Sequence, residues 1–237
     1  MVSWFRSPRP RAPLPRLRSR SSHLVSTKVD FAELAPDTSS YLGLVAYLQL
    51  GFFQSISMVS AISELAAKET LSTAAGFALA KHHGVVAEIR RRGEDPTEVM
   101  APYVSRVDSF LTLTRGASVN ENLLSIYITQ GFLDDFFIRL SDGLPNDQGA
   151  RYASLLGADS GSAGIVSLLT DAIGVDPKRA HFLAMCGRRL LGDTLLLAQS
   201  ALVLEGHSES EDARIEPVFT ELIATHTRRM DALGLTA

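Results

Sequence analysis

No charged residue lies between Asp37 and Glu64, and this gap constrains the fold more strongly than any other feature of the chain. The stretch is long enough to cross a bilayer as a helix, so a membrane protein is one interpretation. Gln49, Gln54 and several serines interrupt it, however, and no apolar run reaches membrane-spanning length. A helix that is apolar on most sides is also what the centre of a soluble bundle requires. We therefore favour a bundle helix, with its inner stripe at Leu42, Val45, Phe52, Ile56, Val59 and Ile62.

Helical periodicity continues through the rest of the chain, and no convincing pair of strands interrupts it. The first helix is expected to begin at the good N-cap residues near Asp37 and to run to about residue 68. Glycines weaken the middle of the fifth expected helix, over 148–173. Further helices are expected over 71–92, 96–114 with an interruption near Pro102, 119–141, 148–173, 177–205 and 211–234. The pattern predicts an all-α fold.

The first 37 residues read as a basic leader in front of a helical domain over residues 38–237. Residues 1–24 contain arginine, proline and serine but no acidic residue, a composition that cannot form a packed core. Three interpretations stand for this segment: a disordered basic arm, a targeting segment, or translation upstream of the native start. The third rests on "VSTKVDF" from Val25 onward, which resembles a bacterial start if a valine codon initiates.

Composition limits the classes of function. With 46% hydrophobic and 21% charged residues, the chain falls in the ordinary globular class. Because the leader is basic, the domain that follows is more acidic than the formal net charge of −3 indicates. An acidic surface repels phosphate backbones, so we expect no nucleic-acid partner. Cys186 is the single cysteine, which excludes a disulfide framework and favours the cytoplasm.

Three phrases carry a family resemblance: "AYLQLGFFQ" at 46–54, "IYITQGFLDDFF" at 126–137 and "GRRLLGDTLLLAQ" at 187–199. In these phrases, and in the order and length of its helices, the chain resembles the bacterial ferritin-like proteins grouped with the tRNA isopentenyladenosine hydroxylases. The resemblance covers roughly residues 40–205 and implies a ferritin-like four-helix bundle with additional C-terminal helices. Catalytically active members of that group bind two irons through four helices, which supply a Glu, a second acidic residue and two Glu-x-x-His motifs.

The chain departs from that ligand pattern almost everywhere, because it contains no Glu-x-x-His. Amides stand on the first helix where a carboxylate would be expected. The tetrads that correspond to Glu-x-x-His are Lys81-His82-His83-Gly84 on the second helix and Asp159-Ser160-Gly161-Ser162 on the fifth. The resemblance therefore implies a degenerate di-iron site with no metal or other cofactor, iron being the alternative. Its candidate residues are Gln49, Gln54, Lys81, His82, His83, Gln130 and Asp134.

Lys81 and Asp134 are expected to replace the metal with an ion pair. A bundle that loses its cations must neutralise the acids that remain, since an unpaired buried carboxylate is costly. Lys81 lies where the resemblance places the acid of the second helix, within reach of Asp134. The alternative is that Lys81 extends to solvent and that Asp134 lies on the outer face of its helix.

His82 and His83 cannot both enter one site, because neighbouring residues on a helix point about 100° apart. We expect one ring to lean inward and the other to face solvent or a neighbouring helix. A hydrogen-bonded core or surface histidine is the favoured interpretation over a metal ligand.

Three hypotheses for function follow. The first is a non-catalytic ferritin-like bundle with a structural or interaction role, descended from di-iron proteins. The second is a metal-dependent hydroxylase or oxidoreductase related to the tRNA hydroxylases, with an atypical metal site drawn from His82 or His83, Asp134 and their neighbours. The third is a membrane-associated protein that uses the first helix. Under the first hypothesis we expect a cytoplasmic homodimer with no membrane partner, and whether the chain is an enzyme stays open.

Deletion of residues 1–24 should leave the fold and the melting temperature unchanged, because their composition gives them no core to contribute to. Circular dichroism and thermal melts of the full and shortened chains measure this. A loss of more than a few degrees would show that the segment packs on the bundle.

Overall fold

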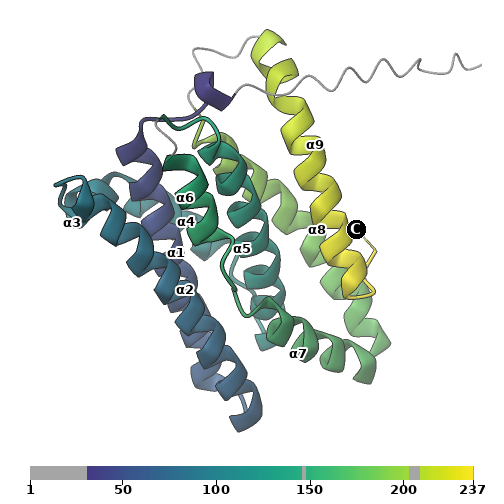
Figure 1. The fold of residues 1–237 in the computed structure, drawn as a ribbon. Helices are drawn as coiled ribbons and strands as arrows, with labels where there is room; N and C mark the ends of the chain where they lie inside the picture. The colour runs from purple at the N-terminus through teal and green to yellow at the C-terminus, as the bar shows by residue number, and fades with distance from the viewer. Residues whose placement is uncertain (1–30, 146–147, 203–208, 237) are drawn as a thin grey trace, which may run out of the picture.

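The computed structural model describes residues 31–145, 148–202 and 209–236, and the greater part of the expected leader lies outside them. Within the described residues the chain forms helices and no strand, so the predicted all-α class is confirmed. The buried apolar side chains of these helices make one continuous core. Figure 1 shows the long helices running side by side, with shorter helices covering one end and one side of the bundle.

The bundle begins with two long helices that pack along each other, α1 (Thr38–Ile62) and α2 (Leu65–Arg91). A third long helix, α5 (Val119–Ser141), packs on α1. The fourth position, against both α2 and α5, is filled by two shorter helices, α6 (Gln148–Leu156) and α7 (Ser162–Val175). Figure 1 shows α6 and α7 following each other in the space beside α2 and α5.

The turn between the first two helices differs from the sequence prediction, which carried the first helix to about residue 68. α1 ends at Ile62 and α2 begins at Leu65. Ser63 and Glu64 have extended backbones, and the Ser63 hydroxyl donates to the Val59 carbonyl oxygen at 2.7 Å. These two residues alone make the turn, so the helices reverse direction without a long loop.

The fifth predicted helix, 148–173, is wrong as a single element, because residues 157–161 interrupt it. Gly161 adopts a left-handed backbone with φ +69°, and a Cβ there would overlap Ala74 of α2. Both conditions require glycine. The interruption lies between α2 and α5, beside the middle of the bundle, and it shapes the site described below.

Two further helices pack on the side of α5 away from α2: α8 (Pro177–Gln199) and α9 (Glu209–Ala232). α8 ends at Gln199, short of the expected residue 205. Pro217 lies inside α9, which continues through it. The segment predicted over 96–114 forms α3 (Pro96–Met100), the 3₁₀ turn η2 (Ala101–Tyr103) and α4 (Val104–Leu113), interrupted at Pro102 as expected.

The end of the expected leader is structured where the chain is described. Phe31–Glu33 form the 3₁₀ turn η1, and the backbone N–H of Ala35 donates to the Phe31 carbonyl. Leu34 is buried in the core. The helical domain therefore begins before residue 38, because an apolar residue upstream of the first helix covers the end of the bundle.

α1 contains the uncharged stretch for which a membrane-spanning helix was the alternative interpretation. Among the described residues it is the one helix that is long and apolar enough to cross a bilayer. Most of its apolar stretch is buried by the other helices, including Leu42, Leu48 and Phe52. A core helix of a soluble protein has this property.

Two glycines test how closely the helices approach. A Cβ at Gly43 of α1 would overlap the Val99 carbonyl oxygen of α3, whereas a Cβ at Gly76 of α2 meets no atom within 4 Å. Gly43→Ala should therefore destabilise the fold by about 1–3 kcal/mol through overpacking. Gly76→Ala, the matched control, should stabilise it by about 0.5–1 kcal/mol through helix propensity. Urea unfolding of both variants measures the difference, and equal effects would refute the close approach at Gly43.

Candidate functional site

A buried ion pair joins α2 and α5 in the middle of the bundle. The Lys81 Nζ atom lies 2.7 Å from Asp134 Oδ2, and the two side chains are 3% and 10% exposed. The ion pair predicted between these residues is present in the structure. The alternative positions, Lys81 in solvent and Asp134 on an outer face, are wrong.

Gln49 of α1 completes the pair. Its Nε2 atom donates to Asp134 Oδ1 at 2.7 Å, so each carboxylate oxygen of Asp134 accepts a hydrogen bond from a different helix. Gln130 lies one turn before Asp134 on α5 and is buried as well. The candidates Gln49, Lys81, Gln130 and Asp134 therefore lie inside the bundle. Gln54 does not, because its side chain is exposed on the other side of α1.

Burial controls the electrostatics of Asp134. Removal from water raises the pKa of its carboxyl above the ordinary value, because burial disfavours the charged form. The Lys81 ammonium and the hydrogen bonds from Lys81 and Gln49 lower the pKa and oppose that effect. The carboxylate is thus held in a buried site by the ammonium and the amide.

The two histidines separate as expected for neighbours on a helix. His82 is buried, and its Nδ1 atom donates to the Ala46 carbonyl oxygen of α1 at 2.9 Å. Burial lowers the pKa of His82, which favours the neutral ring. His83 is exposed. Neither histidine lines the cavity beside Asp134, so this geometry favours structural roles.

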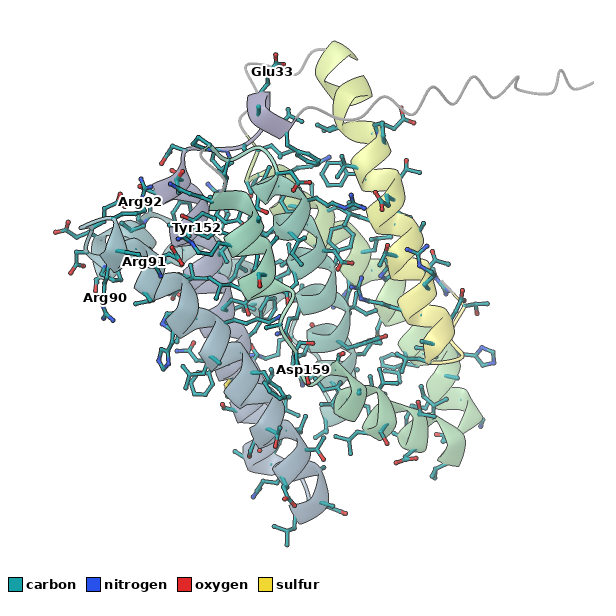
Figure 2. The ribbon with its side chains drawn as sticks, in the orientation of Figure 1. Glu33, Arg90, Arg91, Arg92, Tyr152 and Asp159 are labelled. Carbon is teal, nitrogen blue, oxygen red and sulfur yellow. The ribbon has the colours of Figure 1, made fainter. Side chains whose placement is uncertain are left out.

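A polar cavity of about 240 Å³ lies beside the ion pair. It is bordered by α2, α5, α9 and the interruption between α6 and α7. Figure 2 labels Asp159 at this interruption, where a continuous fourth helix would otherwise run. Among the polar residues of its wall are Lys81, Gln130, Asp134, Asp135, Ser160, Ser162 and Arg229.

Arg229 was not found from the sequence. It comes from α9, where its Nη2 atom donates to Asp135 Oδ2 at 2.7 Å and to the Gly131 carbonyl oxygen at 3.0 Å. A side chain at residue 131 would overlap the Arg229 guanidinium, so Gly131 lets the arginine lie against α5. The glycine within a long helix was the one available signal, and it does not name its partner.

The residues present do not fit a di-iron centre. Such a centre needs several carboxylates and imidazoles that converge on two cations. Among the described residues, no group of three or more His, Cys, Asp or Glu side chains converges in this way. The positive charge of Lys81 also lies at the carboxylate that would bind the metal, and it would repel the metal.

Comparison with known families and proteins bears on the fold as a whole. No curated protein matches the chain. The family model described as a ferritin-like domain of actinomycetes matches residues 36–220, which is most of the chain. The match includes the long helices α1, α2 and α5, the interrupted α6–α7 position and α8. The chain belongs to this ferritin-like family.

Proposed function

We propose that this protein is a non-catalytic ferritin-like bundle with a structural or interaction role, descended from di-iron proteins. The observation that carries the proposal is the buried Lys81–Asp134 ion pair with its hydrogen bond from Gln49. An ammonium and an amide occupy both oxygens of the carboxylate that remains at the centre of the bundle.

The ion pair makes metal binding unfavourable on chemical grounds. A cation that approached Asp134 would have to displace a hydrogen-bonded ammonium from a buried site. The displaced Lys81 would then be a buried charge without a partner, which costs several kcal/mol. The neutral amides Gln49 and Gln130 cannot supply the negative charge that two irons need.

A closer relationship to one group of ferritin-like proteins rests on the sequence phrases at 46–54, 126–137 and 187–199. They support descent from the ferritin-like proteins grouped with the tRNA isopentenyladenosine hydroxylases. The actinomycete description of the matching family supports a bacterial source. A cytoplasmic location, a homodimer, and the lack of nucleic-acid and membrane partners stay predictions.

Metal content separates this proposal from the metal-dependent hydroxylase. Protein purified from iron-supplemented cells, and protein exposed to ferrous iron without oxygen, should hold well below one iron per chain by elemental analysis. Asp134→Asn is the control, because it removes the charge at the centre and keeps the shape. Iron near two per chain that Asp134→Asn abolishes would refute the proposal, whereas iron that this variant retains is bound elsewhere.

A double-mutant cycle in urea tests whether the pair holds the centre of the bundle together. Lys81→Met alone should cost on the order of 3 kcal/mol, because it leaves Asp134 buried and unpaired. The double change with Asp134→Leu should recover much of that loss.

The matched control is the exposed ion pair between Arg139 and Glu221, whose side chains are 48% and 56% exposed. Its coupling energy, from single and double changes to alanine, should lie between about 0 and 1 kcal/mol. If the coupling between Lys81 and Asp134 also falls below about 0.5 kcal/mol, the pair does not stabilise the centre.

A further inference from the structure

We propose that the cavity beside the ion pair binds a small carboxylate carried on a short apolar body. This ligand site goes beyond the proposed structural role, and nothing in it requires a metal. The hydrogen-bond donors of the cavity wall, its net charge and its size each support the proposal.

Gln130 provides the first donor. Its side chain is 4% exposed and lines the cavity, and its Nε2 atom has no hydrogen-bond partner among the described residues. A buried donor without a partner costs about 1–3 kcal/mol. Native proteins seldom leave such a group unsatisfied, so its presence in a cavity wall indicates a missing acceptor.

The N-terminus of α7 provides further donors. The N–H of its N-cap, Gly161, already donates to Asp159 Oδ1 at 2.8 Å, but Gly161 has no side chain to cap the first turn, and Ser160 and Ser162 on either side line the cavity. The first N–H groups of a helix and its dipole favour an anion at this end. The two serine hydroxyls can donate to the same anion.

Lys81 is a third donor in the cavity wall. Its ammonium carries three protons, and one of them is used by Asp134 Oδ2. The charges around the cavity are otherwise paired, Lys81 with Asp134 and Arg229 with Asp135. The residues that line the cavity therefore present no excess negative charge, and the Asp159 carboxylate, which is not among them, accepts from the Gly161 N–H. The helix terminus favours one negative charge in the cavity.

Size and apolar lining define the rest of the ligand. Ile138, Leu156 and Ile165 lie in the same wall as the polar groups. A cavity of about 150 Å³ accommodates benzene, so about 240 Å³ has room for a small ring or short chain with a carboxylate. The structure thus favours a compact organic acid over an inorganic anion or a neutral molecule.

Three probes separate these chemistries: benzoate, benzyl alcohol, which keeps the ring without the charge, and inorganic phosphate, which lacks the apolar body. Amide chemical shifts of the full chain, followed by NMR, report binding. Benzoate should bind saturably with a dissociation constant on the order of 1 mM. Its shifts should concentrate at residues 130–135 and 158–165.

Two variants and one control test the contacts. Gln130→Met removes the unpartnered donor and should weaken benzoate binding about fivefold or more. Gln54→Met is its matched control, since Gln54 is an exposed amide on α1, and it should leave binding unchanged. Ser162→Asp should also weaken binding, because it places a negative charge in the cavity wall.

Ser162→Asp tests the ligand site independently if Gln130→Met fails to fold. An acid in the first turn of a helix stabilises it, so this variant should raise the melting temperature while it weakens benzoate binding. A purely structural role for residue 162 predicts the stabilisation alone. The proposal is overturned if benzoate shows no saturable binding, if Ser162→Asp leaves its affinity unchanged, or if benzyl alcohol or phosphate binds as tightly.

Discussion

The buried carboxylate of Asp134 is the constraint on which the centre of this bundle depends. A buried carboxylate needs compensation for the water it loses, and here one oxygen accepts from α2 and the other from α1. Because Asp134 lies on α5, three helices meet at one carboxyl group. Sliding any of them by a turn would separate charge from partner, so the pair fixes the relative positions of α1, α2 and α5.

The fourth position of the bundle follows from the same centre. In metal-binding relatives of this fold a continuous helix supplies ligands there, whereas this chain breaks at residues 157–161. The left-handed backbone of Gly161 and its approach to Ala74 hold the break against α2. The interrupted helix leaves a polar cavity beside the ion pair, and Ser160 and Ser162 line it.

Much of this centre could be predicted from sequence, and the exceptions have physical reasons. The pair of Lys81 and Asp134 was predicted from charge balance at the helix positions that the family resemblance implied. The choice of Gln54 as a site residue could have been avoided from the sequence. It lies five residues from Gln49, and at about 100° per residue the two side chains point to different sides of α1. Arg229 was not predictable, because its contact with Asp135 depends on how α9 packs, and no local pattern encodes that. The end of α1 at Ile62 was not predicted either, because the turn at Ser63 and Glu64 contains no glycine or proline.

The direction of the Asp134 pKa indicates what the ion pair contributes. A carboxyl whose pKa is raised by folding binds its proton more tightly in the folded state than in the unfolded state. Its contribution to stability is therefore complete below the unfolded pKa, and it is lost as the pH rises through the folded pKa. Ionisation of Asp134 therefore costs the folded state stability relative to its protonated form, and the apolar core around the carboxyl group offsets that cost. Apolar residues of similar volume would often serve stability as well. The pair instead specifies the alignment of the helices, because its charge and amide contacts fit one alignment of α1, α2 and α5, whereas apolar side chains would tolerate several.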